Sequence, residues 1–307
     1  MTIVAAVLMF YVSMTPIHTA RADETAAQKA SVGAEDVSGA TETVKCPNCG
    51  ETFTIGRHGQ EAVTATCPKC GKELSSDACK MDECKTFSYG ADAGFFSKYV
   101  ARGVVTTNGA VFQPDVWANW KGATFSVWGN MDLTDVNKLG GEFNELDINL
   151  AYSGNIGKVC YSAGGIYYTY PNTTFKDTAE VYGSLGLETL LKPKLTLYYD
   201  FVEANGVYVL FSVGHSVELL KKGNLGAELE LSAQAGFGSA GFNRLYFDTG
   251  HGSITDMVFT VSLPVECRES LTVKPSLAWS TVPYRKIRAK QANNDNVIAG
   301  LTLSAAF

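Results

Sequence analysis

The chain ends with the stretch NVIAGLTLSAAF at residues 296–307, in which every second residue from Val297 to Phe307 is apolar. Gly300, Thr302 and Ser304 are interleaved with them. Successive side chains of a β-strand point to opposite faces of the sheet. The stretch therefore predicts a strand with one apolar face and one more polar face.

The same alternation recurs through the C-terminal two thirds of the chain. Leu146, Ile148 and Leu150, for example, alternate with Glu145 and Asp147. Twelve runs follow this pattern, near residues 87–99, 111–120, 123–132, 142–153, 158–170, 178–189, 195–202, 206–219, 225–237, 254–265, 271–281 and 296–307. An even number of strands, each of about ten residues, is typical of a bacterial outer-membrane barrel.

The connections between these runs alternate in length. They are short after the even-numbered runs, as at Lys121-Gly122 and residues 190–193, and longer after most odd-numbered runs, as at residues 238–253. Short turns on one rim and long loops on the other are typical of the periplasmic and extracellular sides of a barrel. We therefore predict an all-β fold, an antiparallel up-and-down transmembrane β-barrel of about 12 strands over residues 86–307, with a small N-terminal module.

The composition agrees with this fold and argues against other classes. Charged residues make up 18% of the 307 residues, which include 30 glycines. Asp and Glu (31) outnumber Lys and Arg (25), which argues against binding to nucleic acid. No internal stretch reaches about 18 apolar residues, so we expect no membrane-spanning helix.

The N-terminal residues resemble an export signal. Residues 3–12 (IVAAVLMFYV) form a short apolar core, and Ala20-Arg21-Ala22 supplies a small-x-small cleavage pattern. No Lys or Arg precedes the core, which departs from the usual pattern. We expect residues 1–22 to be a signal peptide. Residues 23–43 contain no aromatic residue and are expected to form a flexible tether.

Residues 44–85 carry two CPxCG motifs, at Cys46–Gly50 and Cys67–Gly71. Each motif can hold two thiolates at a spacing that suits tetrahedral zinc. The motifs predict a zinc-ribbon-like module in which Cys46, Cys49, Cys67 and Cys70 bind one structural zinc ion. In an oxidising compartment the same four cysteines could instead pair as disulfides, and this alternative stays open. Cys79 and Cys84 have no assigned role.

Strand parity predicts which side chains face the barrel interior. The predicted inward acidic residues are Asp92, Asp115, Asp132, Glu145, Asp147, Glu180, Glu188, Asp200, Glu218, Glu228, Glu230 and Asp256. The same rule gives only Lys98 and Lys274 as inward bases. Charged rings set selectivity in confined pores, so the pattern predicts a narrow channel for small cationic or neutral solutes.

Two other functions compete with a channel. Small barrels are often filled by side chains, so the chain could be a plugged structural or partner-binding barrel whose module is a periplasmic interaction site. The last long connection carries a basic cluster that could fold inward or bind lipopolysaccharide phosphates. This cluster comprises Arg285, Lys286, Arg288 and Lys290. An enzyme is not expected, because parity puts His215 and Ser216 on opposite faces of one strand.

Three short motifs resemble the opening of the Gcw_chp family of bacterial outer-membrane barrels. They are Ser97–Gly103 (SKYVARG), Gln113-Pro114 and Val127–Asn130 (VWGN). The resemblance could cover residues 87–307 and implies an outer-membrane barrel, with no catalytic residues. The C-terminal Phe307 resembles the signal that the barrel assembly machinery reads.

The predicted location follows from these features. We expect the barrel to lie in the outer membrane of a Gram-negative cell, with the N-terminal module in the periplasm. The expected partners are outer-membrane lipid and lipopolysaccharide, the assembly machinery during biogenesis, and a periplasmic protein that contacts the module.

Overall fold

The computed structural model describes residues 87–307 except 223, 224 and 269, together with the backbone of residues 41–45, 52–56, 64–66 and 73–75. The chain divides into two compact units, one of which contains Phe87–Phe307. The predicted signal peptide, and most of the predicted tether, lie outside the described residues.

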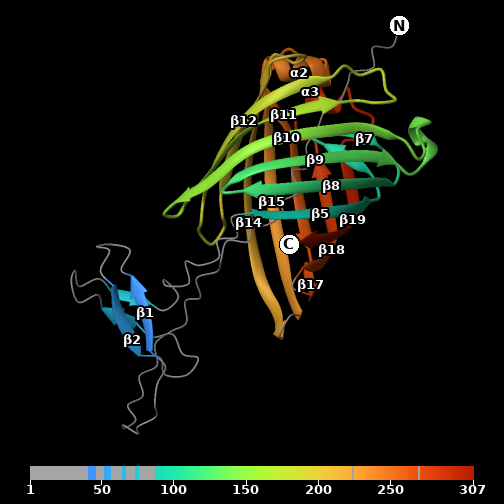
Figure 1. Cartoon of the computed structure of the whole chain (residues 1–307). Coiled ribbons are helices and arrows are strands. Elements are labelled where there is room, and N and C mark those ends of the chain that lie inside the picture. Colours follow the sequence, from blue (N-terminus) through green and yellow to red (C-terminus); the bar gives the residue numbers. More distant parts are fainter. Residues whose placement is uncertain are drawn as a thin grey trace. The chain divides into compact units, whose positions relative to one another are not determined.

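Residues 87–307 form a closed antiparallel barrel (Figure 1). Its strands are β5 (Phe87–Phe96), β8 (Val111–Trp120), β9 (Ala123–Asp132), β10 (Phe143–Ile156), β11 (Val159–Thr169), β12 (Thr178–Leu187), β13 (Lys194–Asp200), β14 (Gly206–Lys222), β15 (Leu225–Gly238), β16 (Ser253–Ser262), β17 (Val265–Arg268), β18 (Leu271–Thr281) and β19 (Asp295–Ala306). The sheet closes because β5 pairs with both β8 and the last strand, β19. Both β16 and β17 lie between β15 and β18, so the 13 strands occupy 12 positions around the barrel, as predicted.

The tight turns form where the sequence permits positive φ angles. Lys121 and Gly122 connect β8 to β9 with φ angles of 51° and 89°. A two-residue hairpin turn with positive φ at both positions matches the twist of the flanking strands. The turn brings Trp120 opposite Ala123 and fixes the register of the hairpin.

The outer surface of the barrel is apolar. Large apolar side chains such as Leu150 (63% exposed), Val181 and Leu277 project outward from the strands. Aromatic residues gather at the short-turn end, where the rings of Tyr89 and Phe307 stack with centroids 5.5 Å apart. In the part of the chain that the structure describes, no helix is long and apolar enough to cross a membrane.

The interior is occupied by segments of the long connections. After β5, the chain forms a small antiparallel hairpin of β6 (Tyr99–Ala101) and β7 (Val104–Thr107), here called the lumen hairpin. Helices α2 (Ala240–Phe247) and α3 (Arg285–Arg288) lie at the same end of the barrel (Figure 1), and a short 3-10 helix spans Asp135–Asn137. The prediction of one strand over residues 87–99 is therefore wrong after Phe96, because the chain leaves the sheet there.

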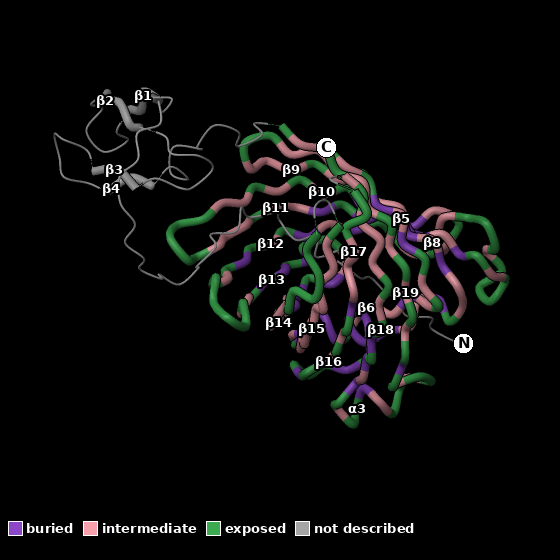
Figure 2. Tube along the Cα trace, turned by 90° about the horizontal axis from the view of Figure 1, so that it is seen from below, coloured by how far each residue is buried: buried purple, intermediate pink, exposed green. Residues whose placement is uncertain are grey.

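A buried apolar cluster holds these segments together. Val104 of the lumen hairpin, Phe242 of α2 and Ile287 of α3 pack with aromatic side chains of the barrel wall, including Tyr168 and Tyr208. The buried positions, purple in Figure 2, fall on these segments as well as on the inner face of the strands.

The described parts of the second unit are two short strand pairs. β1 (Thr41–Lys45) pairs with β2 (Thr52–Gly56), and β3 (Thr64–Thr66) pairs with β4 (Glu73–Ser75). Cys46, Cys49, Cys67 and Cys70 lie outside the described residues, so the zinc-ribbon prediction stays a prediction.

The contact of α2 with β14 gives a test of the interior packing. A Cβ atom at Gly206 would lie 2.3 Å from the backbone nitrogen of Phe242. We expect Gly206→Ala to displace α2 and to lower the free energy of unfolding by about 1–3 kcal/mol, as overpacking does. Thermal unfolding in detergent and limited proteolysis within α2 measure both effects.

The matched control is Gly183→Ala on β12, where a Cβ atom would have no neighbour within 4 Å. This variant should unfold and resist proteolysis like the wild type. Equal behaviour of the two variants would contradict the packing of α2 on β14.

Candidate functional site

The tip of the lumen hairpin carries a buried arginine. Arg102 and Gly103 form the turn between β6 and β7, and Gly103 has a φ angle of 92°. A Cβ atom at Gly103 would lie 2.8 Å from the carbonyl oxygen of Thr255, so both the φ angle and the close approach require glycine. The turn places the Arg102 side chain, 3% exposed, inside the barrel.

Arg102 forms a bidentate ion pair with Glu180 of β12. Its Nη1 and Nη2 donate to the two carboxylate oxygens at 2.7 and 2.9 Å. The hydroxyl of Tyr168 donates to the same carboxylate at 2.8 Å. Burial acts to lower the pKa of Arg102, but the Glu180 carboxylate outweighs it and the pKa is raised, so the guanidinium stays charged.

Aromatic rings surround the guanidinium of Arg102. Its central carbon lies 4.4 Å from the ring centroid of Tyr208, 4.7 Å from that of Tyr198 and 5.7 Å from that of Phe242. Cation–π contacts of this kind stabilise a charge that has lost its water. Arg102 thus joins the lumen hairpin to three other elements, β13, β14 and α2.

A second polar network fixes the other strand of the lumen hairpin. The Thr107 hydroxyl donates to Asp132 at 2.6 Å, and the side-chain amides of Asn137 and Asn144 donate to the same carboxylate at 2.8 Å each. Asn144 in turn accepts from Asn130 at 2.7 Å. Buried polar groups need such partners, and here the barrel wall supplies them to a loop segment.

The structure places the twelve predicted inward acids in three environments. Buried acids are Asp92, Asp132, Glu145, Asp147, Glu180, Asp200 and Asp256. Partly buried acids are Asp115, Glu228 and Glu230, and exposed acids are Glu188 and Glu218. The acids therefore do not form one solvent-lined ring, because most of those toward the long-connection end are covered by the hairpin and helices.

Several buried acids have protein partners of their own. Asp200 accepts from the Thr178 hydroxyl and from the backbone amides of residues 202–204. Asp256 accepts from the hydroxyls of Tyr208, at 3.1 Å, and Thr255, at 2.6 Å. Asp200 thus braces the connection after β13, whereas Asp256 joins β16 to β14.

A smaller group of acids has unpaired oxygen atoms. Asp92 and Asp115 lie opposite each other on β5 and β8, and each has one buried oxygen with no hydrogen-bond partner. Both carboxylate oxygens of Asp147 are also buried without a hydrogen-bond partner. Within residues 87–307 as described, however, no three His, Cys, Asp or Glu side chains are arranged to hold a metal ion.

The predicted basic cluster remains at the surface. Arg288 forms an ion pair with Asp295 at 2.7 Å, and Lys290 pairs with Asp248. Arg285 and Lys286 of α3 are exposed. The last long connection does fold inward, but through the apolar side chains of Val282 and Ile287 rather than through its bases.

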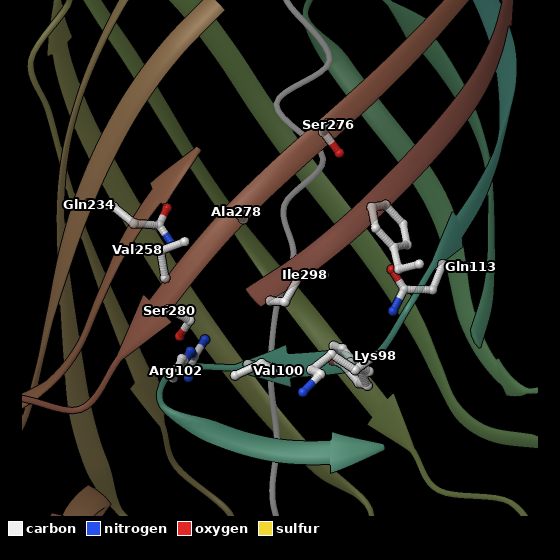
Figure 3. Close-up of a pocket in the computed structure, with 13 residues that line it drawn as sticks. Lys98, Val100, Arg102, Gln113, Gln234, Val258, Ser276, Ala278, Ser280 and Ile298 are labelled. Carbon is white, nitrogen blue, oxygen red and sulfur yellow. The ribbon is translucent and has the colours of Figure 1, made fainter. Parts of the chain in front are cut away.

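A pocket remains beside the lumen hairpin (Figure 3). One side consists of β6 with Lys98 and Arg102, and the other consists of inward side chains of β15, β16, β18 and β19. Its polar lining comes from Gln113, Gln234, Ser276 and Ser280 in addition to these two bases.

Among the described residues, His215, Cys160 and Cys267 do not form a reactive centre. His215 Nδ1 lies 3.0 Å from the carbonyl oxygen of Leu190, while Ser216 follows on the opposite face of β14. Cys160 and Cys267 are free thiols, and Cys160 contacts the Glu188 carboxylate at 3.2 Å. This arrangement does not pair a nucleophile with a base.

Comparisons with known proteins give structural similarity only. No protein-family model and no curated protein matches the chain, so the resemblance to the Gcw_chp family stays a prediction. The NanC porin matches with a TM-score of 0.42 and 8% identity, over 71% of this chain and 98% of that chain. An outer-membrane channel from Pseudomonas putida F1 matches with a TM-score of 0.39 and 9% identity, over 74% of this chain and 100% of that chain. The outer-membrane channel DcaP of Acinetobacter baumannii matches with a TM-score of 0.36 and 10% identity, over 72% of this chain and 96% of that chain. At these values the similarity carries no conclusion about function.

The Arg102–Glu180 pair can be tested by a double-mutant cycle. We expect Arg102→Gln or Glu180→Gln alone to lower the free energy of unfolding by about 3–5 kcal/mol, because each leaves an uncompensated buried charge. The double variant should lose clearly less free energy of unfolding than the two single variants lose together. Denaturant unfolding in detergent micelles measures all three values.

The control is Lys176→Gln, which breaks the exposed pair of Lys176 and Glu203. Such surface pairs contribute about 0–1 kcal/mol. Strictly additive losses in the cycle would show that Arg102 and Glu180 do not stabilise each other.

Proposed function

We propose that the chain is a bacterial outer-membrane β-barrel that provides a narrow passage for small cationic or neutral solutes. The observation that carries this proposal is the inverted polarity of the barrel. An ion pair and several carboxylates are buried inside, whereas large apolar side chains such as Leu150 and Leu185 are exposed outside. A water-soluble protein normally has the opposite distribution.

The closed sheet supports a membrane location. A barrel without edge strands satisfies every backbone hydrogen bond within the sheet, which hydrocarbon requires. Aromatic side chains at the short-turn end, among them Trp120 (61% exposed) and Tyr152 (54% exposed), suit the interface between lipid and water. With this orientation the short turns face the periplasm, and the long connections face outward.

The charge balance of the interior supports the solute class. The twelve predicted inward acids are opposed by Arg102 and by the lysines on or beside the inner face, Lys98, Lys194 and Lys274, so the interior has an excess of negative charge. The exposed Glu188 and Glu218 lie toward the short-turn end, where they would raise the local concentration of cations.

A second candidate is a plugged structural or partner-binding barrel. The observation that favours it is the filling of the long-connection end by the lumen hairpin and α2. The proposed partners, namely lipopolysaccharide, the assembly machinery and a periplasmic protein bound to the N-terminal module, fit either candidate.

Lipid exposure is tested by arginine substitutions at adjacent positions of β10. Leu150→Arg places a charge on the outer face near the middle of the strand, and we expect it to destabilise the inserted barrel by about 2–4 kcal/mol. Ala151→Arg places the same side chain on the inner face and should destabilise the inserted barrel clearly less. Urea-dependent folding into lipid vesicles measures the difference, and equal losses would contradict a lipid-facing outer surface.

The two candidates are separated by planar-bilayer conductance of the full-length protein. A channel should give discrete conductance without anion preference in wild type. The double variant Arg102→Gln/Glu180→Gln should raise that conductance because the lumen hairpin loses its anchor. A barrel that conducts in neither form is a structural barrel, and anion preference would contradict the proposed solute class.

We also propose that Cys46, Cys49, Cys67 and Cys70 bind one structural zinc ion. Support comes from the two strand pairs: β1 and β2 flank the first CPxCG motif in sequence, and β3 and β4 flank the second. Two hairpins, each carrying a pair of cysteines, are typical of a zinc ribbon.

Elemental analysis and thiol counting test the zinc proposal. We expect about one zinc per chain, lost in Cys46→Ser but retained in Cys267→Ser, whose exposed thiol lies on the barrel. Protein without zinc and without free thiols in the module would show that the cysteines form disulfides instead.

A further inference from the structure

We propose that the pocket beside the lumen hairpin is the narrowest point of the solute path and that Lys98 makes it select neutral polar solutes over cations. This inference rests on the proposed function, and it narrows the solute class given there. It concerns the space in Figure 3 between β6 and the wall formed by β15, β16, β18 and β19.

The other half of the interior is closed at this level. On the side of β11 to β14, the Arg102 guanidinium is enclosed by Glu180 and by the rings of Tyr198 and Tyr208. Phe242 of α2 adds a fully buried ring to the same cluster. Close-packed side chains of this kind leave no room for water, so a solute cannot pass on that side.

The part of the opposite wall that β18 supplies is built from small side chains. Ser276, Ala278 and Ser280 are alternate residues of β18 and all three line the pocket. Their small volume leaves a cavity of about 40 Å³, compared with the roughly 10–15 Å³ that one water molecule needs. The space therefore holds a few water molecules or a solute group of similar size beside the hairpin.

The charge of the lining differs from that of the rest of the interior. Among the described lining residues, only Lys98 and Arg102 are charged, and none is acidic. Glu180 neutralises Arg102, whereas the partner of the Lys98 Nζ among the described residues is neutral: it donates to Asn296 Oδ1 at 3.3 Å. The positive charge of Lys98 is therefore not balanced within the pocket.

A single unbalanced charge has a strong effect in a narrow space with poorly polarisable walls. Lys98 repels a cation that enters the pocket, although the acids elsewhere in the interior attract it. A neutral solute with hydroxyl groups meets no such barrier, and it finds hydrogen-bonding partners in Gln113, Gln234 and Ser280. The pocket thus acts against the cation preference of the remaining interior.

Reversal potentials of the full-length protein in a potassium chloride gradient test the role of Lys98. We expect Lys98→Gln to raise the cation-to-anion permeability ratio about threefold or more, and Lys98→Glu to raise it further. Uptake of glycerol into vesicles that contain the protein should change little in Lys98→Gln. The matched control is Lys274→Gln, which removes the same charge from the inner face of β18 outside the pocket.

A smaller increase in the cation-to-anion permeability ratio for Lys274→Gln than for Lys98→Gln supports the proposal, and equal increases overturn it. Ala278→Phe should block the pocket and reduce conductance severalfold, while Ala151→Phe on the inner face of β10 should not. Equal conductance of these two variants also overturns it. A wild-type protein that conducts no ions and takes up no glycerol would instead overturn the proposed function itself.

Discussion

The ion pair between Arg102 and Glu180 is the interaction on which the organisation of the interior depends. It joins the tip of a loop segment to a strand on the barrel wall at 2.7 Å, and aromatic rings exclude water from it. A charged group in such surroundings is stable only with its partner in place. The lumen hairpin is therefore held in one position, and α2 packs on the rings that cover the pair. The filled half of the interior, and the pocket left beside it, both follow from this contact.

The barrel reverses the usual relation between surface and core. The interior is a polar core in which carboxylates such as Asp132 and Asp200 are satisfied by hydroxyls, amides and backbone groups of the long connections. Outside, the same strands present leucine, valine and aromatic side chains. Hydrophobic burial inside the barrel is concentrated in the cluster around Phe242 and in a smaller one around Tyr99 and Val111, and specific polar contacts define how the connections fold.

The alternation of apolar and polar residues was sufficient to predict the barrel itself. The predicted limits of β8, β9 and β18 agree with the structure, because their turns contain Gly or polar residues and their parity is unbroken. Parity could not predict the lumen hairpin, since a residue in a long connection has no assigned face. For that reason the sequence indicates Arg102 only as part of a family motif. The inward acids were found by parity, but their burial depends on segments distant in sequence, which no local pattern reveals. Zinc binding by the four cysteines of the N-terminal module remains a prediction.

The separation of Arg102 and Glu180 along the chain has a consequence for biogenesis. The two residues are 78 positions apart, and β8 to β11 lie between the lumen hairpin and β12. The lumen hairpin follows β5, so its anchor exists only when β5 and β12 both belong to the same sheet. The covering rings of Tyr208 and Phe242 lie further along the chain, on β14 and α2. The bore therefore reaches its final width only after strands from both halves of the sheet have come together, whichever end assembles first.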